Sequence, residues 1–150
     1  MPRIAAIQAS GANPFFRSYM SGFSQREHIQ AQTIATAIKI GDPVSYSRAR
    51  QVIEESNGVV EEVTDEEILA AKTVIDRSGI GCEPASAATL AGACKLVEHG
   101  IIKREEQVVG ILTGNFLKDS QTGIPQHKQD EVVPASIEAV RRFLTHKISF

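Results

Sequence analysis

Apolar residues along the chain fall into short runs of different character, and their order predicts strands and helices in alternation. Residues 3–9 are largely apolar, residues 59–63 contain β-branched valines, and residues 107–112 read Gln-Val-Val-Gly-Ile-Leu. Continuous apolar runs are typical of parallel strands that are covered on both faces. We therefore predict three strands, and residues 107–112 are the clearest candidate for a buried one.

The segments between these runs have helical periodicity and recognisable helix ends. The predicted helices run from Asn13-Pro14 to about Phe23, over residues 45–56, from the capping box Thr64-Asp65-Glu66-Glu67 to Ser78-Gly79, from Pro84 to Gly100, and from Pro134 onward. Strands alternating with helices predict an α/β fold with a mainly parallel sheet and flanking helices. No linker or repeat interrupts the pattern, so we expect one domain over residues 1–150.

Composition narrows the class of protein. The chain has 150 residues, with 16 Lys and Arg against 18 Asp and Glu and a net charge of −2. That balance argues against a basic surface for nucleic acid. No apolar run approaches the roughly 20 residues of a membrane span, and no signal peptide is evident, so we expect a soluble, cytoplasmic protein. The two cysteines and four histidines are scattered, which predicts no metal site.

The first candidate site is Thr113-Gly114-Asn115, directly after the predicted strand at residues 107–112. In open α/β sheets, ligands bind beyond the carboxyl ends of the strands. A hydroxyl, a flexible glycine and an amide there can bind a planar heterocycle. The alternative is an ordinary turn, in which Gly114 supplies an unusual dihedral angle and Asn115 caps the turn. The residues alone leave both interpretations open.

The second candidate is the start of the predicted small-residue helix at Pro84. Glu83 precedes Pro84, so its structural role is that of an anion near a helix N-terminus. A functional role would have Glu83 and Ser86 face a cofactor pocket. These two interpretations also stay open.

Four sequence blocks, taken together, are more specific than any one of them. They read Thr-Ile-Ala-Thr-Ala-Ile-Lys-Ile-Gly-Asp-Pro-Val-Ser at 33–45, Val-Thr-Asp-Glu-Glu-Ile at 63–68, Gly-Cys-Glu-Pro-Ala-Ser-Ala-Ala at 81–88 and Leu-Thr-Gly-Asn-Phe-Leu-Lys-Asp at 112–119. Their order and spacing resemble the C-terminal half of the threonine synthase family. These are pyridoxal-phosphate (PLP) enzymes of fold type II, the tryptophan-synthase-β type. The resemblance implies that the chain is the C-terminal portion of their large PLP-binding domain.

The resemblance also implies roles for individual residues. Thr113, with Gly114 and Asn115 in the same block, matches the residue whose hydroxyl hydrogen-bonds the pyridine nitrogen of PLP. A neutral hydroxyl there does not enforce a protonated ring. Ala37 matches a small residue packed against the cofactor, and Glu83 and Ser86 match residues bordering the pocket. The family reaction converts O-phospho-L-homoserine and water to L-threonine and phosphate.

The chain departs from the family where the Schiff-base lysine should be. The family's lysine lies in a Phe-Lys-Asp-type motif of the N-terminal half, and this motif and the phosphate-binding loop match nothing in the sequence. We therefore assign no catalytic residue and expect no turnover by this chain alone.

Two alternatives to a threonine synthase stay open. One is a non-catalytic, truncated α/β module. The other is part of a different fold-type II PLP enzyme, similar to threonine dehydratase or cysteate synthase. In the enzyme interpretation, the substrate is a small amino acid, and the partner is a second copy of the chain or the missing N-terminal half. We expect the strand at residues 3–9 to lack some neighbours.

Overall fold

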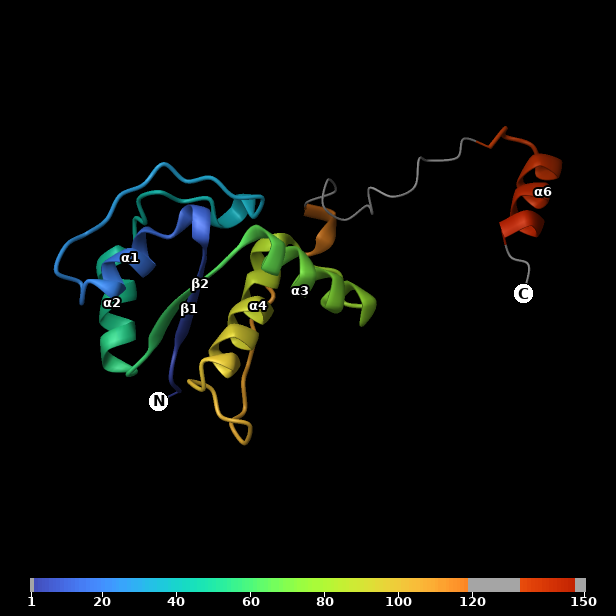
Figure 1. Cartoon of the computed structure of the whole chain (residues 1–150). Helices are drawn as coiled ribbons and strands as arrows, with labels where there is room; N and C mark the ends of the chain where they lie inside the picture. The colour runs from blue at the N-terminus through green and yellow to red at the C-terminus, as the bar shows by residue number, and fades with distance from the viewer. Residues whose placement is uncertain (1, 119–132, 148–150) are drawn as a thin grey trace.

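The computed structural model describes residues 2–118 and 133–147 (Figure 1). The strands are β1 (Ala5–Ala9) and β2 (Val59–Val63). The α-helices are α1 (Pro14–Met20), α2 (Tyr46–Glu55), α3 (Asp65–Arg77), α4 (Pro84–Glu98) and α6 (Ile137–Lys147), and the short 3-10 helices are η1 (Ser10–Ala12), η2 (Thr36–Ile38) and η3 (Phe116–Lys118). Asp119, the last residue of the fourth sequence block, lies outside the described residues.

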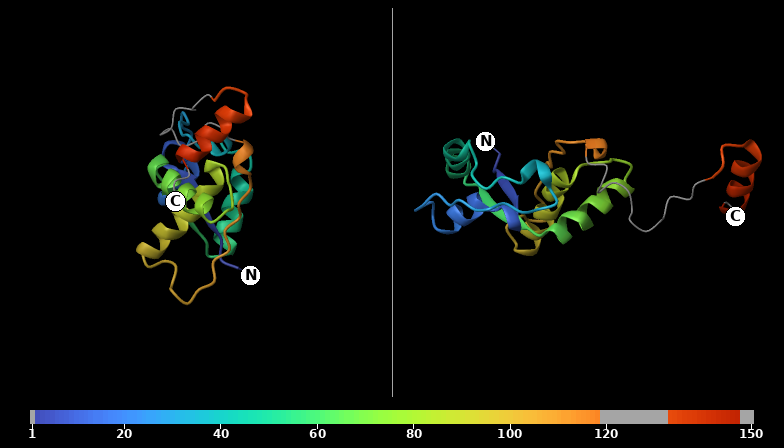
Figure 2. Two further views of the ribbon diagram at one scale, coloured as in Figure 1. Left: turned by 90° about the vertical axis from the view of Figure 1, so that its right-hand side faces the viewer. Right: turned by 90° about the horizontal axis from the view of Figure 1, so that it is seen from above.

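The two strands form a parallel pair covered on both sides by helices. Ala5 lies opposite Val59 and Ala9 opposite Val63. Helices α1 and α2 lie on one side of the strands, and α3 and α4 lie on the other (Figures 1 and 2). This arrangement confirms the predicted α/β fold with a parallel sheet and flanking helices. Within the described residues each strand has one strand neighbour, as we expected for residues 3–9.

The two sides of the sheet are packed with different kinds of residue. On the side of α1 and α2, Phe15 and Tyr46 meet edge to face, with ring centroids 5.5 Å apart, above Ile53 and Val60. On the side of α3 and α4, the core consists mainly of alanines around Ile68. Small residues let α4 lie close to β1.

The sequence signals predict the start of α3 correctly and the end of α1 three residues too late. The capping box of α3 forms as predicted, because the Glu67 amide donates to Thr64 Oγ1 at 3.2 Å and the Thr64 amide donates to Glu67 Oε2 at 2.6 Å. Helix α1 begins at Pro14 but ends at Met20, three residues before Phe23. Phe23 adopts a left-handed backbone conformation with φ of 57°, which a helix cannot continue through.

The predicted strand at residues 107–112 is wrong. These residues have no regular secondary structure, and the side chains of Val109 and Ile111 are 86% and 72% exposed. A strand requires a hydrogen-bonded neighbour, and β1 and β2, the paired strands of the described residues, pair with each other. The segment instead runs beside α4 (Figure 1), where the Thr89 hydroxyl donates to the Ile111 carbonyl at 3.5 Å.

The terminal helix predicted from Pro134 is present as α6, which begins at Ile137 (Figure 2). Its apolar side chains Ile137, Val140 and Leu144 are exposed.

No helix among residues 2–118 and 133–147 is long and apolar enough to cross a membrane. Both cysteines are free thiols, with Cys82 buried and Cys94 exposed. In the same part of the chain, no three His, Cys, Asp or Glu side chains are grouped so as to hold a metal ion.

Candidate functional site

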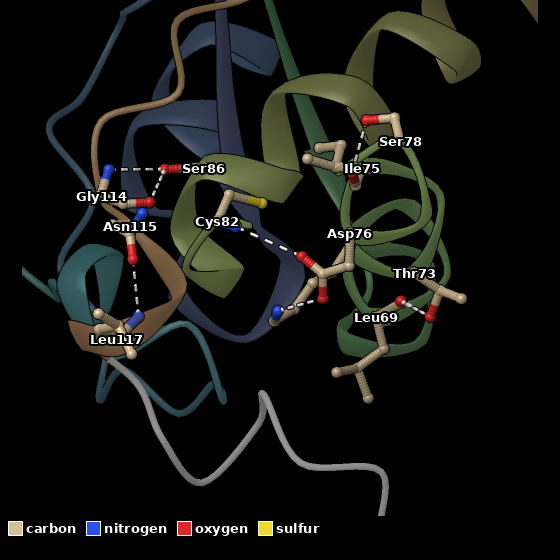
Figure 3. Close-up of polar contacts among 11 residues, drawn as sticks. Leu69, Thr73, Ile75, Asp76, Ser78, Cys82, Ser86, Gly114, Asn115 and Leu117 are labelled. Atoms are coloured by element: carbon tan, nitrogen blue, oxygen red, sulfur yellow. Dashed lines mark hydrogen bonds and ion pairs between the residues drawn. The ribbon is translucent and has the colours of Figure 1, made fainter. Parts of the chain in front are cut away.

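Two segments that are about 30 positions apart in the sequence interlock beside the start of α4. The Glu83 amide donates to the Gly114 carbonyl at 2.9 Å. The Gly114 amide donates to Ser86 Oγ at 3.0 Å (Figure 3). The two candidate sites of the sequence are therefore one site. The start of α4 supplies Glu83 and Ser86, and the extended segment beside it supplies Thr113 and Gly114.

Two glycines of this junction have side chains close to their backbone. A Cβ atom at position 114 would overlap the carboxyl group of Glu83, and a Cβ atom at position 81 would overlap the ring of Phe116. Gly114 does not have a positive φ, so the unusual dihedral angle considered for it is not what selects glycine there. A side chain at position 114 would instead require the Glu83 carboxyl group to move.

The polar side chains of the site form a small hydrogen-bonded cluster. Thr113 Oγ1 donates to Glu83 Oε1 at 3.3 Å and lies 3.2 Å from Ser86 Oγ. Glu83 and Ser86 are buried, with exposed fractions of 8% and 1%, whereas Thr113 is exposed. The result is a hydroxyl on an exposed residue in contact with a buried carboxyl group and a buried hydroxyl.

Asn115 and Ala37 are placed differently from that cluster. Asn115 Oδ1 accepts a hydrogen bond from the Leu117 amide at 3.0 Å, at the start of η3 (Figure 3). This contact gives Asn115 the capping role considered for it in a turn. Ala37 is exposed on η2, which packs against α4, the helix that contains Ser86. The role of Ala37 beside the cofactor stays a prediction.

A supporting contact that the sequence did not predict anchors the loop before Glu83. Asp76, near the end of α3, accepts a hydrogen bond from the Cys82 amide at 3.3 Å (Figure 3). Its Oδ2 also lies 2.6 Å from Nζ of the buried Lys72, with which it forms an ion pair. Burial, together with the charge of Asp76, raises the pKa of the Cys82 thiol. A mid-helix Lys-x-x-x-Asp pair normally indicates a solvated helix face, so nothing in the pattern indicated this anchor.

The fold is that of a known group of enzymes. The crystal structure of a threonine deaminase from T.th. is similar, with a TM-score of 0.53 and 21% sequence identity over 75% of this chain and 39% of that one. Residues 1–114 match the model of the pyridoxal-phosphate dependent enzyme family. The chain therefore belongs to the pyridoxal-phosphate dependent enzymes. The match includes Glu83, Ser86, Thr113 and Gly114.

Relatives with higher sequence identity are threonine synthases. The chain is 46% identical to the threonine synthase of Methanosarcina acetivorans over 98% of its own length, and 39% identical to that of Methanocaldococcus jannaschii over 96%. It is 37% identical to threonine synthase 2, chloroplastic, of Arabidopsis thaliana over 87%. It spans 37%, 36% and 26% of the lengths of these relatives, respectively.

The donor set of the site fits one part of pyridoxal phosphate. Its pyridine nitrogen needs a single hydrogen-bonding partner, and the hydroxyl of the exposed residue Thr113 is such a group. The buried side chains of Glu83 and Ser86 contact that hydroxyl and hold it in place. These residues fit the ring-nitrogen side of the cofactor.

Proposed function

We propose that this chain supplies the ring-nitrogen side of the PLP site of a threonine synthase, which converts O-phospho-L-homoserine and water to L-threonine and phosphate. The observation that carries the proposal is the Glu83–Ser86–Thr113–Gly114 cluster. It lies within the PLP-family match, in a chain up to 46% identical to threonine synthases. Identity at that level over nearly the whole chain favours this reaction over that of the deaminase, whose 21% identity supports only a shared fold.

Each residue of the site has a defined role in the proposal. The Thr113 hydroxyl binds the pyridine nitrogen, and Ser86 and Glu83 hold that hydroxyl in place. Gly114 lets Glu83 lie beneath the site, Asn115 fixes the chain just beyond it, and Ala37 packs against the cofactor ring. When bound, the cofactor withdraws electrons from the α-carbon of the amino-acid substrate.

The lysine for the cofactor comes from outside the described part of this chain in the proposal. Lys72 is buried against Asp76, and Lys95 Nζ donates to the Glu62 carbonyl at 2.7 Å, so both lysines have structural roles. We infer that a separate polypeptide that carries this lysine completes the site in the cytoplasm. The relatives support this inference, because each of the three is more than twice as long as the part that this chain matches.

A chimera tests the proposal directly. The matched 37% of the M. acetivorans threonine synthase is replaced by this chain, and threonine and phosphate release from O-phospho-L-homoserine are measured. We expect activity that Thr113→Val reduces by about 10-fold to 100-fold, because one hydrogen bond to a charged or polarised group contributes about 1.5–3 kcal/mol. Thr113→Ser keeps the hydroxyl and is the matched control.

Other results would point elsewhere. A folded chimera that releases ammonia from threonine but no phosphate from O-phospho-L-homoserine would favour a dehydratase-like enzyme. A folded chimera with neither activity would favour the non-catalytic module. Wild-type turnover by Thr113→Val would remove Thr113 from the site.

A further inference from the structure

An aspartate at the start of α3 holds a segment that lies about 30 positions before it in the sequence. Asp65 is the first residue of α3, and its Oδ2 accepts a hydrogen bond from the Ile34 amide at 3.1 Å. Its Oδ1 accepts a hydrogen bond from the Thr33 hydroxyl. Thr33 Oγ1 in turn accepts one from the Ala35 amide at 3.1 Å. One carboxyl group and one hydroxyl therefore fix three consecutive residues of this segment.

The segment that Asp65 holds leads directly into η2, which lies beside the start of α4 (Figure 1). Ala35 is fully buried and belongs to the same hydrophobic cluster as Ala87 and Ala88 of α4. Ala37 is exposed, two positions after Ala35. The position of Ala37 relative to α4 thus depends on the residues that Asp65 holds.

Asp65 has contacts that go beyond beginning its own helix. Thr64 and Glu67 already form the capping box of α3. Asp65 and Glu66 are both acidic residues of the first turn, and negative charge there stabilises a helix N-terminus. The carboxyl group of Asp65 also bonds two groups of a distant segment, at Thr33 and Ile34. Its role is therefore to join α3 to the segment before η2.

We propose that Asp65 is a positioning residue of the cofactor site, which holds residues 33–35 so that Ala37 lies at the cofactor ring. This inference rests on the proposed function, in which Ala37 packs against that ring. A segment that is ordered for only part of the time lowers the apparent affinity for a ligand in proportion to its ordered fraction. Loss of the Asp65 contacts therefore weakens binding through the Ala37 side of the site and leaves the Thr113 side in place.

The experiment uses the full chain and a ring analogue that cannot react with lysine. The probe is 4′-deoxypyridoxine 5′-phosphate, which lacks the aldehyde, and the backbone amide signals of Gly114 and Ala37 report on the two sides of the site. In the wild type, we expect both signals to shift along one binding curve. We expect Asp65→Ala to weaken binding about tenfold and to lose the Ala37 response while the Gly114 response remains.

Matched variants separate positioning from helix stability. Glu66→Ala removes an exposed acid from the same turn of α3, so it lowers the stability of the helix N-terminus and is expected to bind the probe as the wild type does. Thr33→Val removes the hydroxyl at nearly constant shape and is expected to weaken binding, whereas Thr33→Ser keeps the hydroxyl and the affinity. Because Thr33 and Asp65 share one contact, the double variant should lose less than the product of the two single losses.

The outcomes distinguish this inference from the proposed function. Wild-type affinity in folded Asp65→Ala, or an equal loss in Glu66→Ala, overturns the inference and leaves the Thr113 side of the site intact. A Gly114 response without an Ala37 response in the wild type does the same. If Asp65→Ala does not fold, the comparison of Thr33→Val with Thr33→Ser decides. No response of either amide in the wild type, at millimolar probe, contradicts the proposed function and this inference with it.

Discussion

Two apolar regions lie on either side of α4, and one is buried whereas the other is exposed. On one side, α4 lies against β1, and Leu96 and Ile68 are fully buried. On the other side, residues 107–112 run along α4 with Val109 and Ile111 exposed. The second region has the more continuous apolar sequence. An apolar sequence makes burial of a segment favourable. The segment is buried only where another part of the fold packs against it.

The difference in burial is a difference in free energy. Burying a leucine or isoleucine side chain contributes roughly 1.5–3 kcal/mol to folding. Leu96 contributes on this scale because it is enclosed, whereas Ile111, at 72% exposure, leaves most of its surface in water. Mutations on the two sides of α4 are therefore expected to have unequal costs.

Truncation of the buried side has the largest expected effect. Leu96→Ala removes a side chain with 0% exposure and leaves a cavity at its buried position. We expect a loss of about 2–5 kcal/mol in the free energy of unfolding, measured by urea denaturation. A loss below about 1 kcal/mol would show that this side is not a close-packed core.

Enlarging the contact between α4 and β1 has an intermediate effect. A Cβ atom at Gly92 would overlap the side chain of Ile7 on β1, so Gly92→Val forces the helix away from the strand. We expect a cost of about 1–3 kcal/mol in the same measurement. Cys94→Val is the matched control, because it places the same side chain at an exposed position of the same helix. Equal costs for the two variants would contradict the close approach.

Truncation of the exposed side has the smallest expected effect. Ile111→Ala removes apolar surface that is already in water, so we expect a change within about 0.5 kcal/mol. The measurement is again urea denaturation, with Leu96→Ala as the comparison. A cost above about 2 kcal/mol for Ile111→Ala would mean that this segment is buried in solution.

The local elements were predictable because their causes are local. The signals for helix ends act over one helical turn, and the helices form where these signals lie. Examples are the capping box at Thr64 and the proline at the start of α4. The candidate residues Glu83, Ser86 and Thr113 were also found from the sequence. Their direct contact with one another was not, because hydrogen bonds between positions 83 and 113 depend on how two distant segments pack.

The sequence by itself determined the alternation of elements, the parallel α/β class and the residue types of the candidate site. Only the tertiary structure decided that residues 107–112 are not a strand, since pairing needs a neighbouring strand. It also decided that Gly114 lies against the carboxyl group of Glu83 from another segment. Local propensities are encoded in neighbouring residues, whereas burial and steric limits depend on which segments meet.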